Sequence, residues 1–168
     1  MKRKIKFILL LIILVIVISL CYKNDISSIS FINTSGLEYD AHNTEQYYGY
    51  LKVPAIDMNL GFYNYDSPFN DVESNIELIP IPVKNSYLFA AHSGVGKKAY
   101  FNDLALLKID DDIILKIAEV HHHYKVNNIY RTIKDGDISI KNQEGMIYLT
   151  TCDQIIKGYQ LVIEGILV

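Results

Sequence analysis

The sequence predicts a mainly β protein whose strands close into a barrel or pack as a sandwich. Short runs of apolar or alternating residues follow one another closely along residues 44–168, and Pro, Asn or Asp bounds many of them. Within that range residues 99–107 are the best candidate for a short helix, because they carry apolar side chains at helical spacing. Many short strands with few helices are typical of barrels and sandwiches.

The chain begins with a basic segment that is followed by an apolar one. Residues 7–22 carry no charge and are almost all Ile, Leu and Val. At about 1.5 Å per residue this run is shorter than the ~30 Å hydrocarbon core, so it spans a bilayer only if Lys6 and Lys23 snorkel. The basic cluster before it predicts a cytoplasmic N-terminus and an extracellular remainder. Residues 1–22 are therefore expected to be a single-pass transmembrane anchor in the cell membrane.

Two other interpretations of this N-terminal segment stay open. A cleaved signal peptide needs small residues in an Ala-x-Ala-like pattern, which residues 18–22 lack. A lipoprotein signal would acylate Cys21, although Leu20 stands where a small residue is usual. All three interpretations export the domain.

A tether and then a series of short elements follow the anchor. Residues 23–43 are polar and show no clear period, which predicts a tether to a domain over residues 44–168. The first strand alternates until Pro54 interrupts it. We expect strands over residues 48–53, 58–63, 76–80 and 86–91, a helix over 99–107, and strands over 112–117, 119–130, 138–140, 146–151 and 159–168.

The exported part is acidic. Of the 16 Lys and Arg residues, four lie in the first six positions, so 12 remain against 19 Asp and Glu residues, a net charge of −7. The sequence shows no basic stripe of the kind that binds phosphate backbones. Nucleic acid is therefore not an expected partner.

Cys152 is the one cysteine of the predicted domain, because the other, Cys21, falls in the apolar segment. Cysteines outside the membrane normally pair. A lone exported thiol predicts an intermolecular disulfide or a reactive thiol, and a buried inert cysteine is the third possibility.

A histidine also stands where an apolar run ends, since residues 87–91 lead directly into His92 and a glycine-containing loop. A nearby imidazole can stabilise a thiolate and then hand a proton to a leaving amine. The sequence alone does not bring Cys152 and His92 together. Taken by itself, His92 also fits a loop histidine with satisfied hydrogen bonds.

Residues 148–152, Tyr-Leu-Thr-Thr-Cys, resemble the Thr-Leu-x-Thr-Cys motif of the sortase family, with Tyr148 in place of the usual Thr. Residues 49–54 resemble the family's first strand, and residues 99–104 resemble its helix after the histidine. The order of anchor, histidine and cysteine is also that of the family. The likeness covers the domain from about residue 48 to residue 168.

This resemblance implies a closed, sortase-type eight-stranded β-barrel with one or two short helices, and the activity of a cysteine transpeptidase of the Gram-positive cell surface. Such enzymes cut a C-terminal sorting signal of the Leu-Pro-x-Thr-Gly kind between its last two residues. Cys152 would carry the acyl thioester, and His92 would be the general acid and base. The partners would be surface proteins that bear the signal, and an amine of a cell-wall precursor or a pilin lysine. The sortase class, the exact motif, and wall anchoring versus pilus assembly stay open.

One position departs from the family pattern. Sortases carry an arginine on the last strand that helps to hold the substrate carbonyl and its oxyanion, and here Gln160 takes that position. A glutamine amide can donate a hydrogen bond to an oxyanion but brings no charge, and losing one such donor typically costs ~10²–10³ in rate. The alternative source of charge is Arg131, which is predicted at the start of the loop after Tyr130. Thr150 and Thr151 are further expected substrate contacts.

Two clusters invite a metal, but their spacing does not favour one. His121 to His123 lack carboxylates or cysteines at ligand spacing, so they are interpreted as part of a polar strand. Asp110 to Asp112 could bind calcium, as some sortases do near their groove, but a turn before a strand fits them better. We expect no metal and no cofactor.

Two other functions stay open. The same Cys–His pair could serve a hydrolase in which water resolves the thioester, or the domain could bind sorting peptides with little or no turnover because it lacks the arginine.

Overall fold

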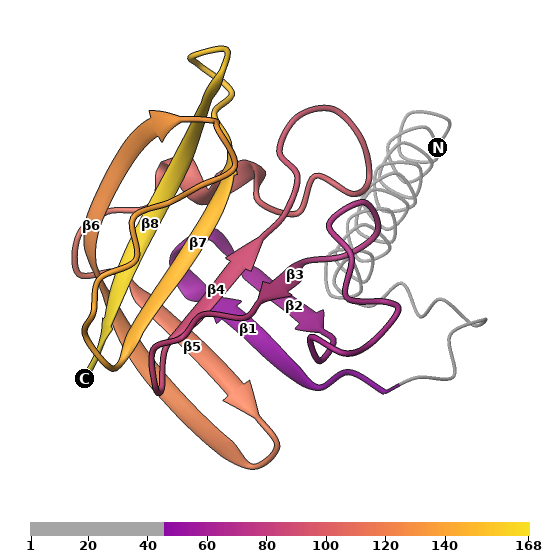
Figure 1. The fold of residues 1–168 in the computed structure, drawn as a ribbon, viewed down its shortest axis with the longest axis vertical. Coiled ribbons are helices and arrows are strands. Elements are labelled where there is room, and N and C mark those ends of the chain that lie inside the picture. The colour runs from indigo at the N-terminus through magenta and orange to yellow at the C-terminus, as the bar shows by residue number, and fades with distance from the viewer. Residues whose placement is uncertain (1–45) are drawn as a thin grey trace, which may run out of the picture. The chain divides into compact units, whose positions relative to one another are not determined.

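The structure, a computed structural model, describes residues 46–168, where it forms a curved eight-stranded sheet with two short 3₁₀ helices (Figure 1). The strands are β1 (Gly49–Val53), β2 (Met58–Phe62), β3 (Glu77–Ile79), β4 (Tyr87–Ala90), β5 (Asp112–Ile117), β6 (Val120–Ile133), β7 (Met146–Cys152) and β8 (Tyr159–Leu167). The helices are η1 (Pro54–Ile56) and η2 (Asn102–Leu106). The predicted anchor (1–22) and tether (23–43) lie outside the described residues. Between residues 46 and 168 no helix is long and apolar enough to cross a membrane.

The strands follow the hydrogen-bonded order β2-β1-β5-β6-β8-β7-β4-β3. β4 and β7 run parallel, and all other neighbouring pairs in the described sheet are antiparallel. The sheet curls around one core, which confirms the mainly β class and the eight strands that the sortase resemblance implies. The prediction of full closure is corrected to a nearly closed barrel. Among the described strands no ladder joins β2 to β3, because the three-residue β3 pairs along one edge only, with β4.

Most predicted elements are present with small shifts in their ends, and two differ from the prediction. The helix predicted over residues 99–107 is the shorter η2, because the hydrogen bonds there run from residue i+3 to residue i, as from the Leu104 N–H to the Phe101 carbonyl. The strand predicted over residues 138–140 is wrong. Ile138 and Ile140 use their side chains to pack on the outside of the sheet, and their main chain joins no ladder.

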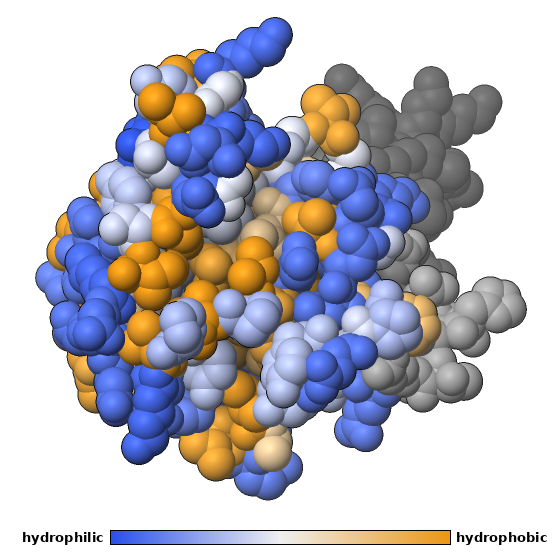
Figure 2. Space-filling model, viewed as in Figure 1, coloured by the Kyte–Doolittle hydropathy of each residue, from blue (hydrophilic) through white to orange (hydrophobic). Residues whose placement is uncertain are grey.

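Apolar side chains are buried on both faces of β7, whose first six residues are all buried. The inner core fills the barrel and draws on every strand. We call the second group, on the opposite face, the outer cluster; its buried members are Leu88, Met146, Tyr148 and Val162, and Ile79, Ile81, Tyr130, Ile138, Ile140 and Ile166 pack against them. In the space-filling view apolar residues gather over the middle of the face that β4 and β7 occupy (Figure 2).

Side-chain alternation along a strand then fixes what each residue of β7 faces. Ile147 and Leu149 belong to the inner core, whereas Met146 and Tyr148 belong to the outer cluster. Cys152, an even number of residues after Tyr148, is therefore on the outer face. It lies at the end of β7, beyond the side chains of the outer cluster. This position makes the thiol half-buried rather than enclosed in the core.

Candidate active site

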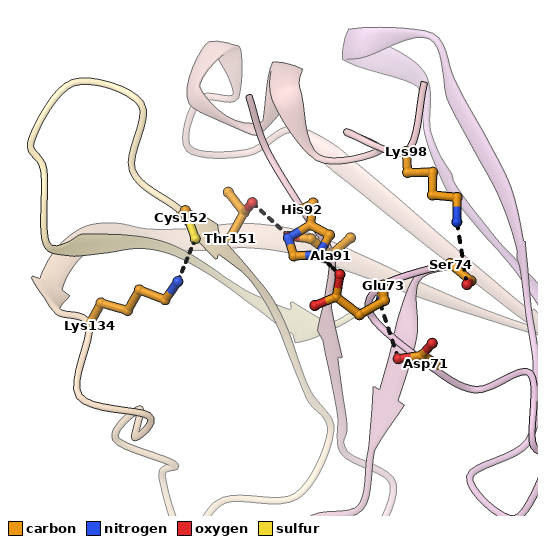
Figure 3. Close-up of polar contacts among 9 residues, drawn as sticks. All are labelled: Asp71, Glu73, Ser74, Ala91, His92, Lys98, Lys134, Thr151 and Cys152. Atoms are coloured by element: carbon orange, nitrogen blue, oxygen red, sulfur yellow. Dashed lines mark hydrogen bonds and ion pairs between the residues drawn. The ribbon is translucent and has the colours of Figure 1, made fainter. Parts of the chain in front are cut away.

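Cys152 and His92 come together because β4 and β7 are parallel neighbours. Their register pairs Ala90 with Thr150, so each chain continues by two residues to reach His92 and Cys152 at the same end of the sheet. Leu88 lies in the outer cluster, and continued alternation puts His92 on the outer face as well. The structure thus brings together the two residues that the sequence could not connect in space (Figure 3).

Buried hydrogen bonds fix the two strand ends. The Thr151 hydroxyl donates to the Ala91 carbonyl over 2.7 Å, and the Ala91 N–H donates to the Thr150 carbonyl over 3.3 Å. The hydroxyl of Thr150 donates to the Leu161 carbonyl on β8. Thr150 and Thr151 therefore hold β7 between β4 and β8, and their predicted contact with a substrate stays a prediction.

The reactive atoms of the pair each contact a charged side chain. The Lys134 ammonium lies 3.0 Å from Cys152 Sγ, and His92 Nε2 lies 3.3 Å from Glu73 Oε2 (Figure 3). In the described part of the chain no hydrogen bond joins the imidazole to the thiol. Both side chains of the His92–Glu73 pair are exposed, at 40% and 76%. Pairs of this kind are worth about 0–1 kcal/mol, so the imidazole can leave Glu73 at little cost.

The loop after His92 is tied to the segment after Cys152. The Ser93 hydroxyl donates to the Cys152 carbonyl. Asn102 takes part in a pair of hydrogen bonds with the main chain of Gly94, and its side-chain oxygen also accepts from the Gln154 amide at 2.8 Å. These contacts keep the loop next to the segment that carries the thiol.

Gln160 lies where the sequence predicts the family arginine to be, directly opposite Cys152 in the β7–β8 register. Val162 belongs to the outer cluster, so Gln160 also faces outward. Its amide is nearly buried and donates to the Asp137 carbonyl at 2.6 Å. That hydrogen bond pins the loop between β6 and β7 to β8 and occupies one of the two amide hydrogens.

Arg131 is not at the start of a loop, which corrects the prediction. It lies within β6, opposite Leu161, because β6 runs on to Ile133. Its guanidinium pairs with the Asp153 carboxylate. Burial acts to raise the pKa of Asp153, but the Ile155 amide and the Arg131 guanidinium outweigh it and hold that pKa below its usual range. A role for Arg131 in substrate contact stays a prediction.

Two charged neighbours were missed by sequence reasoning. Lys134 directly follows β6. The hydrogen bond from its ammonium to Cys152, and the attraction to the charge of Cys152, raise the pKa of the lysine. Glu73 lies in the long loop between β2 and β3, close to His92 only in the folded chain. Neither residue stands in a motif, so only the strand order could have found them.

The candidate metal clusters do not assemble with other ligands. Between residues 46 and 168 no group of three or more His, Cys, Asp or Glu side chains could hold a metal ion. His121 to His123 lie along β6, paired with Lys116, Leu115 and Ile114 of β5. Asp110 lies in a turn before β5, as predicted, with a positive φ of 73°.

A nearly closed β-barrel that presents an accessible thiol beside a histidine has the arrangement of a cysteine-nucleophile enzyme. The family model described as "Sortase domain" matches residues 51–168, and the chain belongs to the sortase family of cysteine transpeptidases. No curated protein sequence matches the chain.

Solved sortase structures share the fold. A lid mutant of sortase A from Corynebacterium diphtheriae superposes with a TM-score of 0.63 at 18% identity, over 77% of this chain and 74% of that one. Sortase C from Streptococcus pneumoniae gives 0.61 at 23% identity, over 75% and 68%. Sortase C from Clostridium perfringens SM101 gives 0.57 at 23% identity, over 79% and 75%. Both A and C types are similar to this chain, so its class stays open.

Proposed function

We propose that this protein is a membrane-anchored sortase that cleaves a C-terminal sorting signal of the Leu-Pro-x-Thr-Gly kind and transfers the released protein to an amine. The observation that carries the proposal is the thiol of Cys152 at the open end of β7, with His92 at the adjacent end of β4 and a cation at 3.0 Å. Positioned strand ends hold reactive groups well because neighbouring strands fix their directions.

The first half-reaction forms an acyl-enzyme. The thiolate of Cys152 attacks the carbonyl carbon of the signal's threonine, and the carbonyl oxygen becomes an oxyanion. The carbon–nitrogen bond to the following glycine then breaks, and His92 in its imidazolium form donates the proton that the leaving amine needs. The products are a thioester on Cys152 and a free glycine-terminated peptide.

The second half-reaction reverses the roles. The incoming amine attacks the thioester carbon and gives a proton to His92, now the general base. The carbon–sulfur bond breaks, which regenerates the Cys152 thiolate and leaves a new amide bond. No net oxidation occurs and no cofactor is needed.

The partners follow from this chemistry and from the family. The acyl donors would be surface proteins with a sorting signal, and the acceptor would be an amine of a cell-wall precursor or a pilin lysine. A similar structure, sortase C from Streptococcus pneumoniae, is described with regard to pilin substrate specificity. The basic start and the uncharged run 7–22 support an anchor in the cell membrane with the N-terminus inside.

The test uses the full chain in detergent with a Leu-Pro-x-Thr-Gly peptide and intact-mass detection. We expect an adduct of the mass of the acyl fragment that is absent in Cys152→Ala and that decays when triglycine is added, with a ligated product. A panel of sorting peptides that gives no adduct would reject the catalytic proposal in favour of a binding protein. Release of free acid alone, even at high amine concentration, would instead identify a hydrolase.

A further inference from the structure

The site has no charge at the position where the family's arginine stands. The sequence offered two residues in its place, Gln160 and Arg131, and neither puts a positive charge beside Cys152. Gln160 is neutral, and its amide already binds the Asp137 carbonyl. Arg131 shares the inner side of β6 with Ile129, because Tyr130 between them packs on the outer cluster. Its guanidinium is held by Asp153 on that side. Arg131 therefore points away from the face that carries Cys152.

Lys134 is on the correct face. Alternation from Tyr130 through Thr132 leads to Lys134 on the outer side, at the point where β6 ends beside β8. The Lys134 N–H donates to the Gly158 carbonyl at 2.9 Å, which anchors the lysine main chain to the loop between β7 and β8. The side chain then reaches across the end of β8 to the sulfur of Cys152 (Figure 3).

We propose that Lys134 is the cation of this active site, and that it replaces in function the arginine whose position Gln160 occupies. In the free enzyme the ammonium stabilises the Cys152 thiolate. During acylation the negative charge moves from sulfur to the carbonyl oxygen of the substrate, and the ammonium follows it. Lys134 gains and loses no proton in these steps. The inference about the oxyanion rests on the proposed transpeptidase function, whereas the inference about the thiolate does not.

The chemistry of lysine suits both tasks. An ammonium has three donors on a flexible four-carbon stem, so it can contact the sulfur and a neighbouring oxygen in turn. It lacks the planar fork of arginine and binds as a point charge. The Lys134 side chain is exposed in the free protein, so solvent weakens its effect there, and a bound peptide would strengthen it by excluding water.

The test separates the two roles by using two readouts on the full chain. The first is the rate at which neutral iodoacetamide alkylates Cys152 at pH 7, which follows the thiolate population and needs no substrate. We expect Lys134→Met, which keeps the stem and removes the charge, to slow alkylation about 3- to 10-fold at low salt and less at high salt. Lys134→Arg should keep most of the rate. The matched control is Lys157→Met, in the exposed loop between β7 and β8, which should leave it unchanged.

The second readout is the rate of acyl-enzyme formation with a sorting peptide. Lys134→Met should reduce kcat/KM about 10²-fold or more, chiefly through kcat, and adding Gln160→Arg to that variant should restore part of it. Alkylation of Lys134→Met within twofold of wild type would overturn the thiolate contact. Slow alkylation with unchanged acylation would overturn the oxyanion role. Failure of wild type to acylate would reject the transpeptidase but leave the alkylation result to decide the thiolate contact.

Discussion

The loop that carries Lys134 is held by a charge pair whose loss should be measurable as a change in stability. Glu164 lies in the middle of β8 on the outer face, and its side chain is 3% exposed. The Lys141 ammonium, which is 46% exposed, pairs with this carboxylate. The amide of Asn128 adds a hydrogen bond at 3.3 Å. The pair ties residues 134–145 to the outside of the barrel.

The perturbation is Lys141→Met, which leaves the Glu164 carboxylate buried without its cation, beside the Asn128 amide and the Tyr130 hydroxyl. Breaking a fully buried pair costs about 3–5 kcal/mol. Because the Lys141 side chain is nearly half exposed and Asn128 remains, we expect a loss of about 2–3 kcal/mol in the free energy of unfolding. With a urea m-value of about 2 kcal/mol/M, the midpoint should fall by about 1–1.5 M.

The assay is urea unfolding followed by tyrosine fluorescence, with Lys157→Met as the matched control. The double variant Lys141→Met/Glu164→Gln should regain most of the lost stability, because the buried carboxylate is then neutral. A midpoint for Lys141→Met equal to that of the control would refute the reasoning. A double variant no more stable than Lys141→Met would show that the loss comes from packing rather than from the unpaired charge.

Three further outcomes follow from the site. Arg131→Met should destabilise the fold by about 1 kcal/mol at pH 7; because the folded pKa of Asp153 is lowered, this difference should be lost as the pH falls below about 4, as urea midpoints across pH would show. Glu73→Gln should change acylation kcat/KM by less than about threefold, since its contact with His92 is exposed, and a tenfold loss would mean that Glu73 orients the imidazole. Thr151→Val should lower stability by about 1–2 kcal/mol in urea unfolding and slow acylation, because a buried hydrogen bond to Ala91, the residue after β4, is lost; unchanged values for both would contradict that role.

The sequence was sufficient for most of the strands, including β7, which ends at Cys152. The run from Met146 to Leu149 is continuously apolar because β7 is buried on both faces, and this pattern is a strong local signal. Residues 138–140 also gave the sequence pattern of a strand, because Ile138 and Ile140 pack against the outer cluster, but their main chain joins no ladder. An alternating pattern reports burial of side chains, and pairing of the main chain has to come from the neighbouring strands.

The proximity of Cys152 to His92 depends on strand order. Sixty residues separate them, and only the parallel pairing of β4 with β7 puts their strand ends side by side. Glu73 and Lys134 reach the site in the same way, from a loop and from a strand end that are remote in sequence. Local patterns carry no information on that order, which the packing of the whole barrel decides.

A β-bulge in β6 decides which face of the sheet each of its later side chains occupies. Before the bulge, Tyr124 and Val126 face the inner core; after it, Ile129 faces inward and Tyr130 outward, since the register with β8 shifts between Val126 and Asn128. The even positions of β6 thus change from the inner to the outer face. Strict alternation along β6 would put Lys134 on the inner face and Arg131 on the face of Cys152, the opposite of what the structure has. One extra residue in β6 therefore determines which cation lies beside the thiol. Because that change of face puts Lys134 on the side of Cys152, its ammonium reaches the thiol although the residue opposite Cys152, Gln160, is neutral.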